Sequence, residues 1–412
     1  MANILVTDGN QRSALAVTRS LGAARHRVYV CSPVARSLAG VSRYATAHAH
    51  VASALEEPRR YVRDVRALVS RWRIAVLLPV TEESAYAILG AEGAFRNVII
   101  PMPLYRSFVR ICEKPRALEA AEKLGIRIPR QTILRTKPTP ADVRATVRGL
   151  TFPLVVKPAT SVVADGNRRA KLDVRHATNR SRLLRALEAM PDEAFPLMLQ
   201  ERIQGPGVGV FLLLWNSEVI ASFAHRRLRE TQLTGGASVD RESIDIDPDL
   251  LEKSVALLRA FNWRGVAMVE YKVDRNTGTP VLMEVNGRFW GSLQLAIDAG
   301  VDFPALLVNA ALGDPGTPVT TYRAGVRSRW FWGDVDRLLK QLRVPSSKPH
   351  GTGKLRSLAH FLSASWQARN EVMRPTDPAP GLLESWQWVR TRGRHAYRKL
   401  AQKLWSQSQQ QG

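Results

Sequence analysis

Two apolar stretches decide the fold: residues 266–273 (VAMVEYKV) and residues 281–288 (VLMEVNGR), joined by the turn DRNTGTP. Strand-forming residues on both sides of a turn rich in Asp, Asn, Gly and Pro predict an antiparallel hairpin. A turn centred on Thr277 places Glu270 directly opposite Glu284. Two opposed carboxylates lie about 4.5–5.5 Å apart at Cβ and repel each other, which is tolerable when a cation lies between them.

The second strand of this hairpin carries further polar groups. Because side chains alternate along a strand, one face is expected to hold Glu284, Asn286 and Arg288. The other face is expected to hold Val281, Met283 and Val285. Two carboxylates and an amide oxygen form a hard, all-oxygen set that suits Mg²⁺. The alternative is a solvated sheet face with incidental acids, but the neighbouring amide and guanidinium favour a metal and phosphate.

This spacing resembles a known signature. Glu270, followed by Glu284-x-Asn286-x-Arg288, resembles the metal and substrate motif of the ATP-grasp superfamily. That superfamily includes biotin carboxylase, carbamoyl phosphate synthetase and many carboxylate–amine ligases. The resemblance implies that Glu270 and Glu284 hold Mg²⁺ (or Mn²⁺) on the phosphates of ATP. It also implies that Asn286 completes a second metal site and that the catalytic Arg288 steadies an acyl phosphate or carboxylate.

Residues 1–110 alternate apolar strands with helices, which predicts a doubly wound parallel sheet. The predicted strands are residues 3–7, 27–31, 74–79 and 97–100, and the predicted helices are residues 12–21, 61–72 and 82–90. The turn after the first strand lacks G-x-G-x-x-G, which argues against a nicotinamide cofactor. In the ATP-grasp resemblance this domain precedes the ATP-binding part, and Asp8, Thr81 and Glu82 are candidates for the second substrate's pocket.

Two lysines are candidates for phosphate binding. Lys114 opens a helix that ends at Gly125, and the segment through Pro129 resembles the entry into ATP-grasp chains, where the lysine contacts nucleotide phosphate. Lys157 lies in the apolar run PLVVKP, where an unpaired buried ammonium costs several kcal/mol and needs an anion. By resemblance this anion is the α- and β-phosphates. A surface charge and an edge-strand lysine in water are the alternatives.

An adenine site is implied by the strand predicted over residues 197–203. By resemblance, Glu201 lies near the exocyclic amine, and the main chain at Arg202 and Ile203 pairs with the ring. The following PGVG has no acid to grip ribose, so that contact is not assigned. The loop predicted over residues 159–171 has only Gly166 where many ATP-grasp enzymes carry a glycine-rich flap, and basic side chains are the expected substitute.

A cationic loop is predicted over residues 225–230 (HRRLRE), before the glycine pair at 235–236. Planar, bidentate arginines suit a polyphosphate or a carboxylate substrate, and Arg227 is taken as a catalytic residue beside Arg288. A solvated basic run is the alternative. His225 is expected to be structural or to support a neighbouring binding residue.

Composition bounds the remaining classes. The 412 residues are enough for two or three domains, and the formal net charge of +24 favours polyanions, acidic substrates or an anionic membrane surface. The alternative explanation of this charge is a general bias of the proteome toward arginine, unrelated to function. Only two cysteines, no apolar run of about 20 residues and no charged leader predict a cytoplasmic protein without a membrane span.

The last part of the chain differs from the rest. Residues 321–412 contain 17 Lys and Arg against 5 Asp and Glu, together with six tryptophans. Residues 386–405 predict a basic amphipathic helix or helix pair. Such a segment suits packing on the body as a cap, peripheral contact with an anionic membrane, or contact with nucleic acid.

The expected organisation is therefore α/β and α+β: a Rossmann-like domain (1–110), an ATP-grasp domain with antiparallel sheets (111–315), and a basic, Trp-rich C-terminal helical extension (316–412). The expected activity is an ATP-dependent, ADP-forming ligase that joins a small-molecule carboxylate to an amine. Two alternatives are an ATP-grasp enzyme acting on bicarbonate through carboxyphosphate, and a non-enzymatic binder of nucleic acid or anionic membrane. Sequence-specific nucleic-acid binding is not expected because no recognition motif is present. The sequence does not indicate an oligomeric state.

Overall fold

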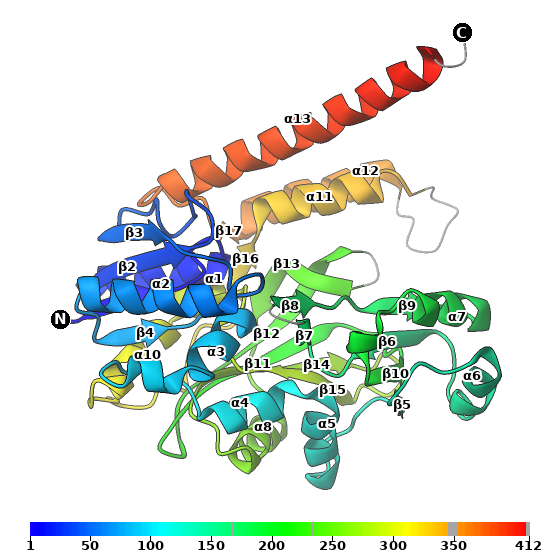
Figure 1. Ribbon diagram of the computed structural model, residues 1–412, viewed down its shortest axis with the longest axis horizontal. Coiled ribbons are helices and arrows are strands. Elements are labelled where there is room, and N and C mark those ends of the chain that lie inside the picture. Colours follow the sequence, from blue (N-terminus) through cyan, green and yellow to red (C-terminus); the bar gives the residue numbers. More distant parts are fainter. Residues whose placement is uncertain (166–167, 233–234, 345–352, 409–412) are drawn as a thin grey trace.

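The computed structural model describes residues 1–165, 168–232, 235–344 and 353–408. It has a parallel-sheet domain at the N-terminus, antiparallel sheets in the middle and helices at the C-terminus (Figure 1). The predicted mixed α/β and α+β fold is confirmed.

The N-terminal domain is a four-stranded parallel sheet in the order β3-β2-β1-β4. Its strands are β1 (Asn3–Val6), β2 (Arg27–Ser32), β3 (Ala47–His50) and β4 (Val76–Leu78). Its helices are α1 (Arg12–Ala23), α2 (Pro58–Arg71) and α3 (Glu82–Leu89). Helix α1 covers one face and α2 the other, because successive strand residues face opposite sides.

Two predictions for this domain need correction. Residues 97–100 form only an isolated parallel bridge, between Val76 and Ile99, instead of a strand. Strand β3, whose sequence is AHAH, was not predicted, because its half-exposed alternation carries little apolar signal. It pairs in parallel with β2.

The middle of the chain forms two antiparallel units joined to the first domain by α4 (Tyr105–Cys112) and α5 (Lys114–Lys123). The smaller sheet has the order β5-β10-β6-β9. Its elements are β5 (Gln131–Leu134), α6 (Pro140–Thr146), β6 (Leu154–Pro158), β9 (Arg175–Ala177), α7 (Arg180–Glu188) and β10 (Leu197–Glu201). The segment predicted as a loop over residues 159–171 instead contains an antiparallel pair, β7 (Val162–Asp165) and β8 (Arg168–Lys171).

The larger sheet has seven strands in the order β15-β14-β11-β12-β13-β16-β17. These strands are β11 (Gly207–Trp215), β12 (Glu218–Gln232), β13 (Gly235–Ser243), β14 (Gly265–Val273), β15 (Pro280–Asn286), β16 (Arg327–Arg329) and β17 (Arg369–Asn370). The predicted cationic loop at residues 225–230 is wrong, since these residues continue β12. Pairing with β13 holds this basic stretch extended, with register shifts after Arg227, and His225 and Arg226 also pair with β11.

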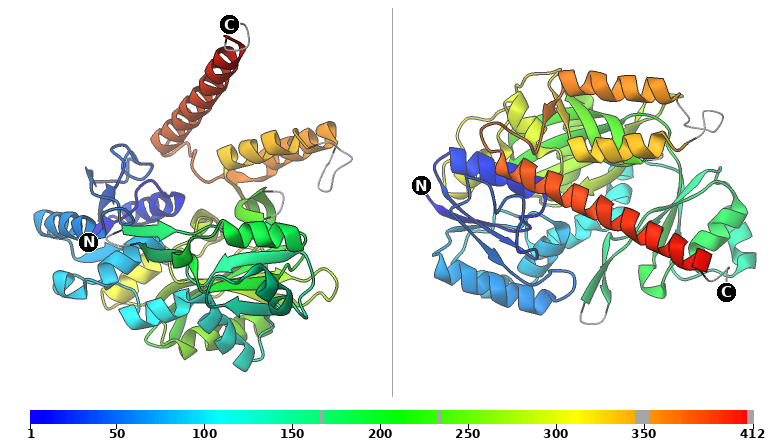
Figure 2. Two further views of the ribbon diagram at one scale, coloured as in Figure 1. Left: turned by 45° about the vertical axis from the view of Figure 1, so that its right-hand side comes forward. Right: turned by 90° about the horizontal axis from the view of Figure 1, so that it is seen from above.

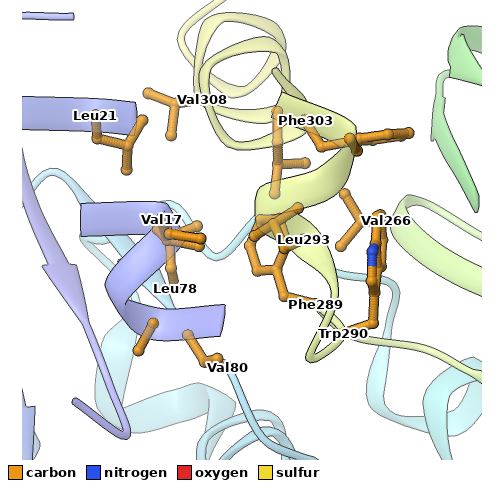
Figure 3. Packing of buried hydrophobic residues seen from close by; sticks show 14 of the residues in the cluster. Val17, Leu21, Leu78, Val80, Val266, Phe289, Trp290, Leu293, Phe303 and Val308 are labelled. Atoms are coloured by element: carbon orange, nitrogen blue, oxygen red, sulfur yellow. The ribbon is translucent and has the colours of Figure 1, made fainter. Parts of the chain in front are cut away.

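Apolar side chains cover both faces of the larger sheet. One face packs on α4, α5 and α8 (Pro248–Ala260). The other packs on α9 (Leu293–Ala299), α10 (Phe303–Ala311) and helix α1 of the N-terminal domain, as Figure 3 shows around Trp290, Phe303 and Val17. This shared core joins the two domains. Within the described ranges no single helix is long and apolar enough to span a membrane; α9 and α10 pass that test only as a pair bent by 91°.

The C-terminal part is helical but also completes the larger sheet. It holds α11 (Phe331–Gln341), α12 (Lys354–Gln367) and α13 (Ala379–Ser408), and α13 rises away from the body (Figures 1 and 2). Strands β16 and β17 belong to the seven-stranded sheet, so the sheet continues past the predicted boundary at residue 315. The start of α13 packs on α11, where the indole rings of Trp332 and Trp388 stack with centroids 4.1 Å apart.

Residues 369–377, here called the connector, bind the N-terminal domain, and one arginine makes four of the hydrogen bonds. Arg19 of α1 donates to the main-chain oxygens of Glu371, Val372 and Asp377, and its Nε lies 2.8 Å from the Asp377 carboxylate. Asp377 also accepts from Ser42 Oγ. Every nitrogen of the Arg19 guanidinium therefore holds the connector.

We expect Arg19→Met to lower the free energy of unfolding by about 3–5 kcal/mol, because it leaves the buried Asp377 without its counter-ion. Urea unfolding followed by tryptophan fluorescence measures this change. Arg27→Met, which removes an exposed arginine from β2, is the matched control. Equal stability of the two variants would contradict the conclusion that Arg19 holds the connector on the N-terminal domain.

Candidate active site

A cavity of about 620 Å³ lies between the two antiparallel sheets and the start of α1. Nine of the ten predicted site residues line it: Lys157, Glu201, Arg202, Ile203, Arg227, Glu270, Glu284, Asn286 and Arg288. The tenth, Lys114, lies just outside. A larger hollow of about 1150 Å³ lies between α5 and β5, but neither glutamate of the hairpin lines it. The smaller cavity is therefore the candidate active site.

The predicted pairing of Glu270 with Glu284 across β14 and β15 is confirmed, but the turn is not centred on Thr277 as predicted. Beyond this pair the register shifts, so that Tyr271 pairs with Leu282 and Met283 is the extra residue of a bulge. The bulge reverses the alternation toward the turn. Met283 lines the cavity beside Glu284, while Leu282 packs in the core.

The face predicted for Met283 was therefore wrong. The same holds for Val281, which pairs with the cavity-lining Lys272 and so shares its face of the sheet. The face predicted for Val285 was right, because Val285 packs in the core.

The Glu284 carboxylate is held ionised inside the protein. Burial alone would raise its pKa, but the charges of Lys114 and Lys157 and a hydrogen bond from Asn286 outweigh burial, so its pKa lies below the ordinary value. Both lysines come from other elements, Lys114 from the start of α5 and Lys157 from β6. The negative charge is thus stabilised by cations that the tertiary fold brings to it.

Glu270 has a different partner. Arg227 Nη2 lies 2.5 Å from Glu270 Oε2, and Arg227 Nη1 lies 3.3 Å from Glu230 Oε1. Burial would lower the pKa of Arg227, but the two glutamates outweigh it and raise the pKa above its ordinary value. Arg227 is therefore a permanent cation that links β12 to the hairpin.

Asn286 and Arg288 extend this network along the edge of the cavity. Asn286 Nδ2 donates to Glu284 Oε1 at 3.1 Å, and Arg288 Nη2 donates to Asn286 Oδ1 at 3.2 Å. Arg288 Nη1 donates to the main-chain oxygen of Phe289 at 2.9 Å. These bonds aim the amide oxygen and the guanidinium at the same region as the carboxylates.

The hairpin residues fit a hard divalent cation. Glu270, Glu284 and Asn286 offer two carboxylates and an amide oxygen, which is the donor chemistry of Mg²⁺ or Mn²⁺. Among the described residues no three His, Cys, Asp or Glu side chains gather into a metal site. A cation here would complete its coordination with phosphate oxygens and water, as Mg²⁺ usually does in nucleotide sites.

Lys157 and Lys114 have the burial and placement expected of phosphate ligands. Burial lowers the pKa of Lys157, although Glu284 and Glu270 act in the opposite direction. Lys114 is buried, and its Nζ donates to Ser161 Oγ at 2.9 Å. An anion at this end of the cavity would stabilise both ammonium groups.

The N-terminal domain places one acid, Glu82, near the lysines and Glu284. Burial raises the pKa of Glu82 at the start of α3, and the nearest charges are Arg288, Lys114 and Glu284. Asp8, another candidate for the second substrate's pocket, instead accepts hydrogen bonds from Thr7, Ser84 and the Thr81 main chain. Neither Asp8 nor Thr81 lines the cavity.

The predicted adenine site lies where β10 ends. Glu201 Oε1 accepts from the Thr151 main-chain nitrogen at 2.7 Å, and the Arg202 main-chain N–H donates to the Pro153 oxygen at 3.0 Å. Because that N–H is already used, a base at this position would meet the Arg202 carbonyl and the Ile203 N–H.

The β7–β8 hairpin stands where a phosphate flap was predicted. Lys171 Nζ lies 3.1 Å from Glu83 Oε1, and the Arg169 guanidinium lies over the Tyr86 ring. Both contacts tie the hairpin to α3 of the N-terminal domain. Gly166, the predicted flap glycine, lies outside the described residues.

Sequence reasoning missed several residues that line the cavity. Arg12 comes from α1, Arg241 from β13 and Trp290 from the loop after β15. They are far apart in sequence, and no spacing rule connects them. His225, expected to be structural, also lines the cavity and is almost fully buried.

Comparisons with known proteins agree with this geometry. Residues 193–332 match the model of a family described as ATP-grasp in the biosynthetic pathway with Ter operon. A sequence comparison with curated proteins finds no match.

Among solved structures, the fold is similar to biotin carboxylase from Campylobacter jejuni (15% identity, 79% of this chain and 74% of the other, TM-score 0.60). It is also similar to N5-carboxyaminoimidazole synthetase from Staphylococcus aureus (14%, 83% and 84%, TM-score 0.60). A third similar structure is L-amino acid ligase from Bacillus licheniformis (16%, 76% and 74%, TM-score 0.56). At these identities the likeness shows a shared fold.

We expect Lys157→Met to raise the dissociation constant for Mg·ATP by roughly tenfold or more, because a charge-assisted hydrogen bond contributes about 1.5–3 kcal/mol. The melting temperature should change little, because the variant also removes a buried ammonium. Calorimetric titration measures the affinity. Lys123→Met, which breaks an exposed pair with Glu119, is the control. Unchanged nucleotide affinity in Lys157→Met would contradict the assignment.

Proposed function

We propose that this protein is an ATP-dependent carboxylate–amine ligase, because residues 193–332 match the model of an ATP-grasp family and about four fifths of the chain shares its fold with biotin carboxylase and N5-carboxyaminoimidazole synthetase. The γ-phosphoryl group passes from ATP to a carboxylate oxygen, which releases ADP and forms an acyl phosphate. An amine then attacks the acyl carbon, the C–O bond to phosphate breaks, and the amine loses a proton. The products are an amide, ADP and phosphate.

One observation carries this proposal. Glu270 and Glu284 are paired across a hairpin, and cations from three other elements balance them inside a single cavity. In phosphoryl transfer the protein forms few or no covalent bonds, and catalysis depends on positioning the reactants and stabilising their charge. The cavity supplies the groups for both.

Each predicted residue has a role in this scheme. Glu270, Glu284 and Asn286 would hold Mg²⁺ or Mn²⁺, which when bound neutralises phosphate charge. Lys114 and Lys157 bind the nucleotide phosphates. Arg288, oriented by Asn286, faces the group being transferred.

Adenine lies against the end of β10, at Glu201, Arg202 and Ile203. Arg227 keeps Glu270 in place and supplies positive charge to the substrate side. No side chain in this scheme needs to form a covalent bond to the substrate.

We further propose peripheral contact of the C-terminal extension with an anionic membrane. On α12, Leu355, Leu358, Leu362 and Trp366 recur at helical spacing and are 44% to 90% exposed. The helix contains Lys354 and Arg356 and no acid. An apolar stripe flanked by basic residues is what an interfacial helix needs. The two cysteines, both buried and unbonded, suit a cytoplasmic location at the inner face of that membrane.

We expect Glu284→Gln to reduce ADP formation roughly a hundredfold or more, because a metal contact contributes several kcal/mol of transition-state stabilisation. ADP release with Mg·ATP, pooled carboxylates and pooled amines is the measurement. Glu242→Gln, which alters an acid of β13 paired with Arg226, should keep wild-type turnover. Wild-type turnover in folded Glu284→Gln would remove the metal assignment.

We expect the parent protein to sediment with vesicles of phosphatidylglycerol and phosphatidylcholine, and binding to fall as salt rises, since each basic residue near the surface contributes about 1 kcal/mol. The double variant Leu362→Ser, Trp366→Ser should lose most of this binding. Leu312→Ser, which changes an exposed leucine after α10, is the control. Absence of sedimentation in the parent would refute membrane contact and leave the ligase proposal untouched.

A further inference from the structure

We propose that the inner end of the cavity binds a carboxylate group that a substrate keeps unreacted, through Arg12, Arg241 and the indole N–H of Trp290, with Glu371 of the connector as the residue that positions both arginines. The inference rests on the proposed ligase function and names its substrate class: an amino acid, or an acid with a second carboxylate.

Arg12 presents a cation to the cavity from the start of α1. Its Nη1 lies 2.5 Å from Glu371 Oε2, and its guanidinium carbon lies 4.1 Å from the centre of the Trp330 ring. Its Nη2 lies against Gly291, where an added Cβ would come within 3.2 Å of it. Among the described residues Arg12 donates a hydrogen bond only to Glu371. The rest of its guanidinium is available to a ligand in the cavity.

Arg241 lies beside it, almost fully buried on β13. Its Nη1 donates to the Ser238 oxygen at 2.7 Å, and its Nη2 forms an ion pair with Glu371 Oε1. Its Nε is buried and has no hydrogen-bond partner within the described part of the chain. A buried guanidinium N–H without an acceptor is costly, and a ligand oxygen would satisfy it.

The side chains at the inner end of the cavity carry an excess positive charge that one anion would balance. Two guanidiniums share the single carboxylate of Glu371, which does not line the cavity and lies behind them. Arg12, Arg241 and Glu371 together carry a net positive charge of one. The indole nitrogen of Trp290 also lies buried without a partner and adds a neutral donor.

His225 completes the lining without adding charge. Burial, followed by the nearby Arg227 and Arg241, lowers its pKa well below the ordinary value, so the ring is neutral at pH 7. Both of its ring nitrogens are buried without partners in the described residues. Two cations, two neutral polar groups and one shared acid therefore favour a carboxylate over an ammonium or an apolar group.

The strand ladder separates this end from the metal-binding end. Glu270 pairs with Gly209, Gly209 with His225, and Arg227 of the same strand with Arg241. Strands β14 and β13 are thus three strand spacings apart, about 14 Å. The ring of Phe211 occupies the space beside Gly209, where an added Cβ would meet it at 2.6 Å. The reacting group and the distal carboxylate of one substrate would therefore lie at opposite ends of the cavity.

Glu371 places the two arginines through the connector. Its Oε1 also accepts from Ser328 Oγ at 3.0 Å, and its main-chain oxygen accepts from Arg19. The connector is therefore bound both to the larger sheet and to α1. Its role is to set the positions of Arg12 and Arg241, which come from two different domains.

Three substrate pools given to the full-length protein with Mg·ATP test the subsite and its source. The first pairs dicarboxylic acids with amines that lack a carboxylate, and the second pairs monocarboxylic acids with amino acids. The third pairs monocarboxylic acids with amines that lack a carboxylate. We expect ADP release in the first pool if the activated acid carries the extra carboxylate, in the second if the amine carries it, and none in the third.

Variants then assign the effect to the site. Arg12→Met should raise the KM of the active carboxylate compound by about tenfold to a hundredfold, the size of a charge-assisted hydrogen bond, and leave the KM of ATP within about twofold. Arg12→Lys should recover part of the loss. Arg43→Met removes an arginine of the same domain that also contacts the connector, through the Thr376 oxygen, but does not line the cavity. It should behave as the parent.

Several results would overturn the subsite. ADP release in the third pool equal to that in the first two would overturn the subsite, but it would agree with the proposed ligase function. Normal Mg·ATP binding with no stimulation by the first two pools would also overturn it, as would equal effects of Arg12→Met and Arg43→Met. If the parent protein does not bind Mg·ATP, the proposed function itself is refuted.

Discussion

The opposition of Glu270 and Glu284 is the constraint on which the rest of the structure depends. A β-ladder holds both carboxylates in one register, so they cannot move apart to relieve their repulsion. Cations from other elements stabilise the two carboxylates: Lys114 from a helix, and Lys157 and Arg227 from strands of two different sheets. Each of these elements must pack in one place for the charges to balance. The same balance leaves a cavity ready for a metal and a polyphosphate.

A second charge balance joins the ends of the chain. The connector places Glu371 between arginines of the first domain and of the larger sheet, and Arg19 anchors its main chain to α1. The C-terminal part is therefore structural near residue 371 and exposed farther out, where α13 leaves the body (Figure 2). Part of the segment packs on the body, as predicted for a cap, and α13 extends away from it.

Local patterns predicted the elements whose own residues decide their structure. Strands β1 and β4 are mostly apolar runs, and the residues on both sides of the turn at residues 274–280 predict the hairpin that carries Glu270 and Glu284. The errors fell where pairing overrides local preference. Residues 225–230 are too charged to predict a strand, yet pairing with β13, and with β11 at His225 and Arg226, holds them extended. The bulge at Met283 was equally hidden, because it depends on how two strands twist together and not on either sequence alone.

The sequence by itself determined the parallel and antiparallel halves of the fold, the hairpin that carries Glu270, Glu284, Asn286 and Arg288, and the lysine in an apolar strand. These features follow from periodicities of a few residues, which one segment carries alone. Only the tertiary structure decided that Arg12, Arg241 and Glu371 meet, and that Lys114 and Lys157 share one carboxylate. Such contacts join segments hundreds of residues apart or elements of different sheets. Their partners are selected by the packing of whole domains and by the cost of leaving a buried charge unpaired.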